Sequence, residues 1–312
     1  MPKIKHLIYI PFTGLGLYNG FRGNRWLKNR IKIFQQFVIP SLKAQTNQNF
    51  SLWISWRREE KNNPIVKSFI LWLEEHYQTV HTFAGVCFYD DKYEDKVAKE
   101  RLVTSVHGSM GSLLDVIGEC DYVLMTLQPS DDCYHRTAFD GIQKSFVNDL
   151  ECVGFKKGYI CNYLTKELAE YNPNTNPPFV TIKFPREVFI DPLKHVNFTA
   201  LKMDVGKYKA KTPCPSHEYY PFCLKYGAID FRGFLVGVHS ENISTTFVHP
   251  FKGDSVEKEV LKDFGIYDTP NLKINFSIRK RILRALPHSV QKKIRYLFGE
   301  KLWNLWYNFL RA

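Results

Sequence analysis

The order of apolar and polar residues predicts alternating strands and helices over the first half of the chain. His6–Phe12 is an apolar run typical of a buried strand. Trp26–Leu42 carries apolar residues at three- and four-residue steps with Lys and Arg between them, which predicts an amphipathic helix that Pro40 bends or ends. Phe50–Trp56 is expected to form a second strand, and Ile65–Tyr77 a second amphipathic helix.

The same alternation continues to about residue 127. A short strand is expected near Val86–Tyr89, a helix from about Lys96 to Gly118, and a strongly apolar strand at Tyr122–Leu127. Alternation of strands with helices predicts an α/β fold with a mostly parallel central sheet flanked by helices.

The remainder of the chain is less regular. Three further strands and one helix are expected at Gly158–Leu164, Phe179–Phe184, Gly233–His239 and Val256–Phe264. Around Thr269-Pro270 the globular pattern ends. We therefore expect one α/β domain over residues 1–268 and a helical extension over residues 269–312.

The extension is strongly basic. The chain has a formal net charge of +12, and residues 273–312 contain ten Lys or Arg against the single acid Glu300. Apolar residues, including Trp303, Trp306 and Phe309, lie between these charges at helical spacing, which is typical of a helix that lies on an anionic membrane surface. The alternative is helices that pack on the domain with a solvated basic rim. Nucleic-acid binding is disfavoured because the basic excess is concentrated in the extension and not on the domain.

Cysteine usage and hydropathy indicate a reduced compartment. The seven cysteines form no CxxC pair, and Cys133 is expected to be a packing residue. The apolar run at the N-terminus is too short for a signal peptide and stops at Pro11, and no window approaches the roughly 20 apolar residues of a membrane span. We expect a cytoplasmic protein, peripheral at the inner face of the membrane.

Two adjacent carboxylates, Asp131 and Asp132, are the strongest candidates for chemistry. They follow the Tyr122–Leu127 strand across a Pro-Ser turn, and in open α/β sheets ligands bind at such carboxyl ends. Paired carboxylates suit Mg²⁺ or Mn²⁺ carrying a phosphate. The alternative is that Ser130 and the two aspartates cap the next helix, since Ser and Asp are preferred N-caps.

Several blocks of the sequence resemble the rhamnosyltransferase family. Residues 39–54 read IPSLKAQTNQNFSLWI, which is similar to the family's PSL..QT...F.W signature and more loosely to the opening of family 2 glycosyltransferases. Further similar blocks are Trp26–Arg30, Ser130–His135, Gly158-Tyr159, Asn176–Val180 and Val238–Ser244.

The resemblance implies a GT-A fold, in which one α/β domain binds a nucleotide-sugar donor together with a divalent metal, Mn²⁺ or Mg²⁺. Asp131 and Asp132 match the last two acids of the family's metal motif, so at least one of them is expected to bind the metal that bridges the diphosphate. GT-A enzymes often add a late histidine to the metal site, which makes His239 a candidate ligand and His249 a weaker one. Either histidine is equally a structural residue in its strand or loop.

Contacts with the nucleotide-sugar are expected from Pro11, Phe12, Arg57, Arg101, Ser130 and Asp131. Two departures from the family pattern put the donor and the metal in doubt. Pro129 stands where the first motif acid is expected, and Leu127 where an arginine is expected. The second strand ends in Arg57 and Arg58, which either approach phosphate or form a solvated basic turn.

Inverting transfer requires a general base that removes the proton of the acceptor hydroxyl. Glu218 is the first candidate, because it follows a proline-rich loop among aromatic residues, and Glu241 is the second. A capping or exposed loop role for Glu218 is the alternative. The acceptor is expected to be a glycan or a lipid-linked molecule.

Two other functions remain open from the sequence. One is a degenerate or non-catalytic GT-A-like protein that binds anionic membrane or nucleic acid through its basic extension. The other is a metal-dependent phosphohydrolase that uses Asp131, Asp132 and histidines. A family resemblance does not identify the sugar that is transferred.

Overall fold

The computed structural model of the protein describes residues 2–13, 23–56, 60, 62–77, 79–84, 113–146, 149–194, 204–205, 208–209, 220–239, 242, 253–268 and 270–274. The strands are β1 (Ile4–Pro11), β2 (Ser51–Trp56), β3 (Val80–Ala84), β4 (Tyr122–Leu127), β5 (Cys133–Tyr134), β6 (Cys152–Asn162), β7 (Leu168–Tyr171), β8 (Val180–Pro185), β9 (Asp204–Val205), β10 (Tyr208–Lys209) and β11 (Tyr226–Val238). The helices are α1 (Asn24–Ile33), the π-helix η1 (Phe34–Val38), α2 (Ile39–Lys43), α3 (Pro64–His76), α5 (Ala138–Ser145), α6 (Arg186–Phe189), α8 (Tyr220–Cys223) and the 3₁₀-helix η4 (Lys258–Phe264).

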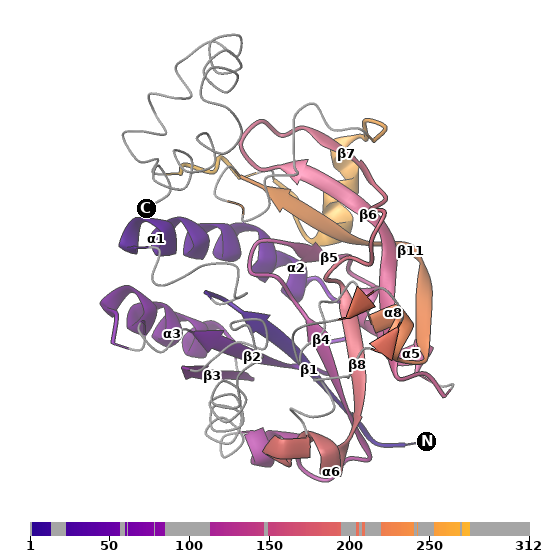
Figure 1. The fold of residues 1–312 in the computed structure, drawn as a ribbon. Helices are drawn as coiled ribbons and strands as arrows, with labels where there is room; N and C mark the ends of the chain where they lie inside the picture. Colours follow the sequence, from indigo (N-terminus) through magenta and orange to yellow (C-terminus); the bar gives the residue numbers. More distant parts are fainter. Residues whose placement is uncertain are drawn as a thin grey trace.

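A nine-stranded sheet forms the centre of the described part of the chain (Figure 1). Its order is β3-β2-β1-β4-β8-β6-β11-β5, with β7 paired to β6. The first four strands are parallel, and β6 and β11 run in the same direction because β8 lies antiparallel between β4 and β6. Only β5, β7 and β8 run the opposite way within this described sheet. The predicted α/β fold with a mostly parallel central sheet is confirmed.

The alternation of side chains along β1 divides the core between the two faces of the sheet. Ile8 and Ile10 face a cluster to which α1, η1, α3 and α5 contribute buried apolar residues. Leu7 and Tyr9 face the opposite cluster, which includes Phe189 of α6. Both faces of the parallel strands are therefore covered, which explains why their sequences read as continuous apolar runs.

The helix that begins at Asn24 continues through Pro40, where we expected a bend or an end. The chain passes from α1 through η1 into α2, and the Ile39 N–H bonds to the Phe34 carbonyl five residues earlier. Pro40 lies in the first turn of α2. A π-turn directly before the proline lets the helix continue without the hydrogen bond that proline lacks.

Other boundaries differ from the sequence prediction. The third strand lies at residues 80–84, whereas the expected strand at Val86–Tyr89 and most of the expected helix Lys96–Gly118 lie outside the described residues. The second half holds longer strands than expected, since β6 begins at Cys152 and β11 at Tyr226. The expected helix Val256–Phe264 is the 3₁₀-helix η4.

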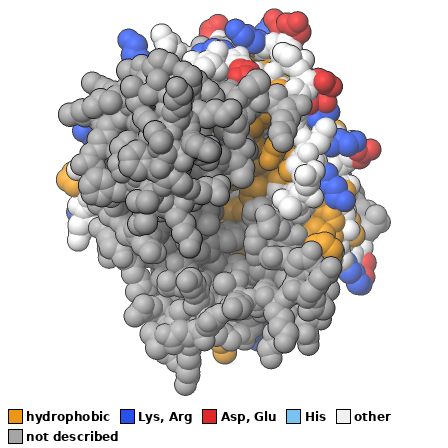
Figure 2. Space-filling view, turned by 45° about the horizontal axis from the view of Figure 1, so that its top comes forward, with side chains coloured by type: hydrophobic (Ala, Val, Ile, Leu, Met, Phe, Trp, Pro, Cys, Tyr) orange, Lys and Arg blue, Asp and Glu red, His pale blue; other side chains and the backbone are white. Residues whose placement is uncertain are grey.

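Residues beyond Ile274 lie outside the described part, so the amphipathic extension stays a prediction. Among the described helices, none is long and apolar enough to cross a membrane. Figure 2 shows Lys, Arg, Asp and Glu side chains interspersed near the rim of the described surface on one face, with hydrophobic side chains nearer the middle. That described surface carries no broad patch of a single charge.

Candidate functional site

The ends of β4 and β11 bring Asp131 and His239 together. Both strands run in the same direction, so the segments that follow them meet at the same edge of the sheet. The Nε2 atom of His239 lies 3.0 Å from Oδ2 of Asp131, although the two residues are 108 positions apart in sequence. The two residues that the resemblance assigned to one site therefore lie together in the fold.

Three side chains converge on a single oxygen of Asp131. Arg30 of α1 forms an ion pair with Oδ2, and His239 and Asn242 contact the same atom, Asn242 through Nδ2 at 3.4 Å. Burial alone would raise the pKa of Asp131, but the Arg30 guanidinium and the bond to His239 outweigh burial and hold this pKa well below its usual range. The negative charge of the Asp131 carboxylate is therefore neutralised inside the protein, chiefly by Arg30.

Asp132 faces a different environment. Its Oδ1 accepts a hydrogen bond from the Gly237 N–H at 2.9 Å, and the residue is buried. Burial, and next the negative charge of Asp131, raise the pKa of Asp132 well above its usual range. The two neighbouring carboxyl groups thus have opposite pKa shifts, Asp131 toward the charged form and Asp132 toward the neutral form.

The two aspartates do not cap a helix. The next helix, α5, begins at Ala138 with Thr137 as its N-cap residue, and β5 lies between the pair and that helix. The turn before them is instead held by buried hydrogen bonds. The Gln128 side chain donates to the carbonyls of Pro129 and Asp132, each at 2.8 Å. The helix-cap alternative is therefore wrong.

The segment that follows the aspartates is fastened to the end of α2. The Gln45 side chain donates to the His135 carbonyl at 2.9 Å and accepts from the Phe139 N–H at 3.2 Å. Ser41 Oγ exchanges bonds of 2.8 and 3.0 Å with the backbone of Tyr134. The Ser and Gln of the PSL..QT signature thus position β5, which pairs with β11 next to the carboxylates.

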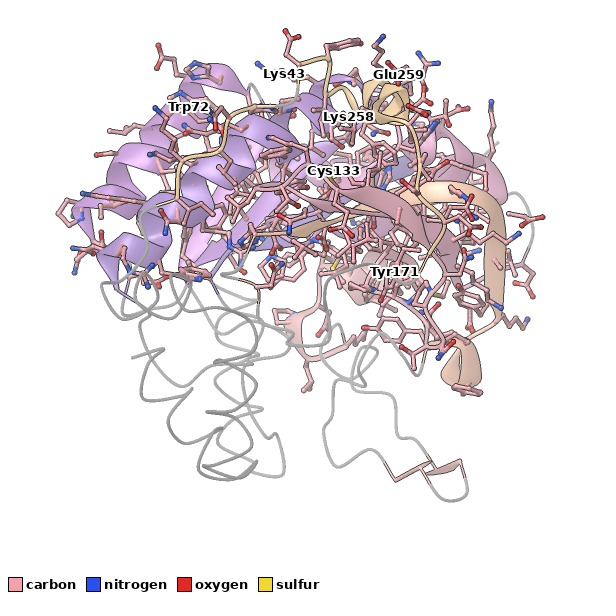
Figure 3. The ribbon with its side chains drawn as sticks, turned by 90° about the horizontal axis from the view of Figure 1, so that it is seen from above. Lys43, Trp72, Cys133, Tyr171, Lys258 and Glu259 are labelled. Atoms are coloured by element: carbon pink, nitrogen blue, oxygen red, sulfur yellow. The ribbon has the colours of Figure 1, made fainter. Side chains whose placement is uncertain are left out.

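Tyr163 completes the inner wall of the site. Its hydroxyl donates to the Asp131 carbonyl at 3.1 Å, and its ring stacks on Phe37 with centroids 3.6 Å apart and lies nearly parallel to the His239 ring. Cys133 lies beside this hydroxyl, in the middle of the described body (Figure 3), and burial raises the pKa of its thiol. The prediction that Cys133 is a packing residue agrees with this placement.

The remaining predicted site residues divide into two groups. Ser130 lies at the site, and its hydroxyl donates to the Phe12 carbonyl at 3.2 Å. Pro11 ends β1, and the Phe12 side chain packs against Trp56 in the core with centroids 4.4 Å apart, so the backbone of Phe12 is the part nearest the turn. Arg57, Arg101, Glu218, Glu241 and His249 lie outside the described residues. Their roles stay predictions.

The described residues fit a divalent metal poorly. Within the described part of the chain, no cluster of three or more His, Cys, Asp or Glu side chains could hold a metal ion. Oδ2 of Asp131 is occupied by Arg30, His239 and Asn242, and Asp132 is engaged by the Gly237 N–H. A dication would meet one remaining oxygen of Asp131 beside a fixed positive charge, whereas Mg²⁺ and Mn²⁺ sites need several anionic oxygens.

Sequence reasoning missed three residues of the site. Arg30 was noticed only as part of a family-like helix start, and Asn242 only as part of a later block, while Tyr163 was assigned only to a strand. Buried arginines are rare unless they are paired, so Arg30 on the inner face of an amphipathic helix was a usable signal. Its partner could not be identified without the tertiary fold.

Comparison with known proteins supports the resemblance over one segment. Residues 21–59 match the family model described as "Putative rhamnosyl transferase", so the predicted resemblance is confirmed over these residues. They include Arg30, Ser41 and Gln45. A search of curated proteins finds no match.

Solved structures show only distant likeness. TarS of S. aureus aligns at 9% identity with a TM-score of 0.35, covering 75% of this chain and 37% of its own length. A "putative nucleotide-diphospho-sugar transferase" from Desulfovibrio desulfuricans G20 aligns at 10% identity and a TM-score of 0.34, covering 77% of this chain and 82% of its own. The inositol-1-phosphate CTP transferase of T. maritima aligns at 11% identity and a TM-score of 0.34, covering 85% and 96%. The chain thus spans about a third of TarS, and likenesses this weak do not assign an activity.

Proposed function

We propose that the chain is a glycosyltransferase that takes a nucleotide-diphosphate sugar as donor and a glycan or lipid-linked molecule as acceptor. The observation that carries the proposal is the position of Asp131. It lies at the carboxyl edge of a mostly parallel sheet, where α/β proteins bind ligands. Residues of the segment matched by the rhamnosyl transferase family model hold Asp131 and the strand after it in place.

The described residues have distinct tasks in this proposal. Asp131 and His239 present a hydrogen-bonded acid–imidazole pair at the edge of the sheet, and the Ser130 hydroxyl ties the turn before them to the Phe12 carbonyl. The buried bonds of Gln128 and Gln45 fix the turn that carries these groups, so little reorganisation is needed when a donor binds. The base that accepts the proton of the acceptor hydroxyl is proposed to be Glu218, or otherwise Glu241, in an inverting reaction.

A divalent metal remains the expectation from the family resemblance, with Asp131 as ligand. Because the described residues fit such an ion poorly, no step of the proposed reaction is assigned to it. Contact of the basic extension with an anionic membrane would bring a lipid-linked acceptor close to the site, and this too is a proposal.

Thermal unfolding with a panel of nucleotide-sugars tests the donor. We expect the midpoint of unfolding to rise with sugars of one nucleotide class, because a ligand that binds only the folded state stabilises it. Incubation with the stabilising donor and candidate acceptors should then release the nucleoside diphosphate. The control is the same chain with Asp131→Ala, which should lose the release.

Other outcomes would replace the proposal. Release of inorganic phosphate without an acceptor would favour the phosphohydrolase. Consumption of a nucleoside triphosphate and a sugar phosphate, with release of pyrophosphate, would indicate a sugar nucleotidyltransferase. A chain that no nucleotide or nucleotide-sugar stabilises would contradict the transferase function.

A further inference from the structure

We propose that the site binds the donor diphosphate without a divalent cation, because Arg30 already pairs with Asp131 in the place that a metal ion would take. This inference rests on the proposed function and concerns how the same site binds its donor. It also departs from the metal-dependent chemistry that the family resemblance implies.

The first observation is the ion pair between Arg30 and Asp131. Both side chains are withdrawn from solvent, with 2% of Arg30 and 15% of Asp131 exposed. The guanidinium is held further by the ring of Trp26, whose centroid lies 5.0 Å from its central carbon. An arginine is permanently charged, so Asp131 lies beside a fixed positive charge at any ordinary pH.

The second observation is that the other two contacts of Asp131 fall on the same oxygen. His239 and Asn242 both meet Oδ2, and Asn242 is fixed by a bond of 2.5 Å from its Nδ2 to the Gly237 carbonyl. Asn242 also accepts from the His239 N–H at 2.7 Å. Moving Asp131 toward a metal would break a connected set of bonds and not a single contact.

The third observation concerns the acids that would share the metal with Asp131. Asp132 is turned onto the Gly237 N–H, and Pro129 occupies the position at which the resemblance expects the first motif acid. Two of the three motif acids are therefore present, one paired with Arg30 and the other turned onto a backbone N–H, whereas Mg²⁺ and Mn²⁺ sites need several anionic oxygens. A dication added at Asp131 would be repelled by Arg30, whereas a diphosphate would meet a neutral cluster.

Arg30 acts in this proposal as a positioning residue through Asp131. It lies within the segment matched by the family model, on the helix that leads into the Ser41 and Gln45 contacts. The same helix thus supplies the charge partner of Asp131 and the hydrogen bonds that hold the strand beyond it.

The test measures binding of UDP, GDP, CDP and dTDP to the full chain by calorimetry, in chelator and in Mn²⁺ or Mg²⁺. We expect at least one nucleotide to bind with dissociation constants that agree within about twofold in the two conditions. Binding that appears only with metal would overturn the inference and leave the transferase proposal intact. Absence of binding to every nucleotide in both conditions would count against the transferase proposal and against this inference with it.

Two variants sharpen the test. Asp131→Asn leaves Arg30 without its counter-charge, and its dissociation constants in chelator and in Mn²⁺ should still agree within about twofold; a tenfold or greater weakening that appears in Mn²⁺ and not in chelator would show that Asp131 acts as a metal ligand. Arg30→Gln frees the charge of Asp131, so a Mn²⁺-dependent rise in the unfolding temperature should appear that the wild-type protein lacks. That rise should disappear in the double variant Arg30→Gln with Asp131→Asn.

The matched control is Lys28→Gln, which removes an exposed positive charge from the same helix. It should bind nucleotide as the wild-type chain does and gain no response to Mn²⁺. A Mn²⁺ response of Lys28→Gln equal to that of Arg30→Gln would overturn the specific role of Arg30. If Arg30→Gln does not fold, the chelator comparison and Asp131→Asn decide the question without it.

Discussion

The two halves of the central sheet are built differently. Strands β3, β2, β1 and β4 are all parallel, with helices between β1 and β2 and between β2 and β3, whereas in the second half the parallel pair β6–β11 has the antiparallel strands β8 and β5 on either side. The register of β11 on β6 shifts twice, between Ile229 and Arg232 and between Arg232 and Phe234. The first half supplies the aspartates of the site, and the second supplies His239 and Gly237.

This difference teaches how the site is assembled. The carboxylates follow from a local pattern, an apolar strand that ends in a turn. Their partners depend on how the second half lies against the first, because Ser41 and Gln45 of the first half bond to Tyr134 and His135, and β5 pairs with β11. The junction of the two halves comprises residues 131–135 and Gly237. Substitutions that affect this junction should therefore lower the unfolding free energy more than substitutions within either half.

Gly237→Ala should produce the largest loss of unfolding free energy, because Gly237 of β11 packs directly against the segment that carries Asp131 and Asp132. A Cβ atom there would lie far inside van der Waals contact of the Asp131 carbonyl and the Tyr163 ring. We expect a destabilisation of about 3 kcal/mol, typical of severe overpacking. Urea unfolding measures it.

Gly141→Ala, within α5, is the control for that substitution. A Cβ atom at Gly141 would lie 3.3 Å from the Phe231 ring of β11. Alanine is favoured over glycine in a helix by up to about 1 kcal/mol, which offsets the close contact, so a change within about 1 kcal/mol is expected. Equal losses at the two glycines would contradict the special role of the junction.

Gln45→Ala should remove the hydrogen bonds by which the first half of the molecule fixes the segment that follows β5. It leaves the His135 carbonyl and the Phe139 N–H without the Gln45 side chain. Unsatisfied buried groups cost about 1–3 kcal/mol, so we expect a loss of about 2 kcal/mol in unfolding free energy together with weaker nucleotide binding.

Gln48→Ala is the matched control for Gln45→Ala. Gln48 lies three residues further along and bonds to carbonyls at the end of α2, including Leu42 and Lys43, and not to the 134–139 segment. It should lose less than about 1 kcal/mol and bind nucleotide normally. The replacement Gln45→Glu should keep the bond from the Phe139 N–H and lose the bond to the His135 carbonyl, since a carboxylate accepts but cannot donate.

The buried side chain of His6 should make the unfolding free energy depend on pH. Its Nε2 lies 2.6 Å from Thr126 Oγ1, which in turn lies 2.6 Å from Thr181 Oγ1, so a buried polar chain connects β1, β4 and β8 across the junction. Burial lowers the pKa of His6 from 6.5 to about 3. Below pH 6.5 the unfolded chain binds a proton that the folded chain does not, so stability should fall with decreasing pH, by at most about 1.4 kcal/mol per pH unit, until about pH 3.

The measurement is the unfolding free energy from pH 7 to pH 4 in the wild-type chain and in His6→Gln. As the pH falls, the unfolding free energy of the wild-type chain should decrease more steeply than that of His6→Gln. Parallel pH profiles would show that His6 does not titrate in this way.

Lys157→Ala should have the smallest effect. Lys157 of β6 and Asp230 of β11 form an ion pair 2.9 Å long within the second half, and both side chains are more than half exposed. Solvent-screened pairs contribute little, so the unfolding free energy should be unchanged within experimental error. A clear loss would show that the second half depends on surface charge in a way that the first does not.

Most of the fold could be predicted where sequence pattern and burial coincide. Tyr122–Leu127 was predicted with the observed bounds of β4, because a strand buried on both faces reads as a continuous apolar run. The start of β11 at Tyr226 was missed, since its first half is partly exposed and interrupted by register shifts.

The site was predicted in part for a related reason. Asp131 was named because it follows an apolar strand, and His239 because it ends a strand within a family-like block. The ion pair of Asp131 with Arg30 joins positions 101 residues apart, and no local pattern encodes such a contact. The signature residue Gln45 was recognised by resemblance, whereas its task at Phe139 is visible only in the folded chain.

The shortness of β5 has a consequence for solubility. This two-residue strand ends the described sheet order beyond β11, and it pairs at Phe234 and Leu235 only. Long, flat edge strands are templates on which other chains aggregate, and very short ones avoid this hazard. Ser41 and Gln45, which hold Tyr134 and His135, thus end β5 before it can act as such a template, and the rest of this edge belongs to β11, whose two register shifts interrupt a regular ladder.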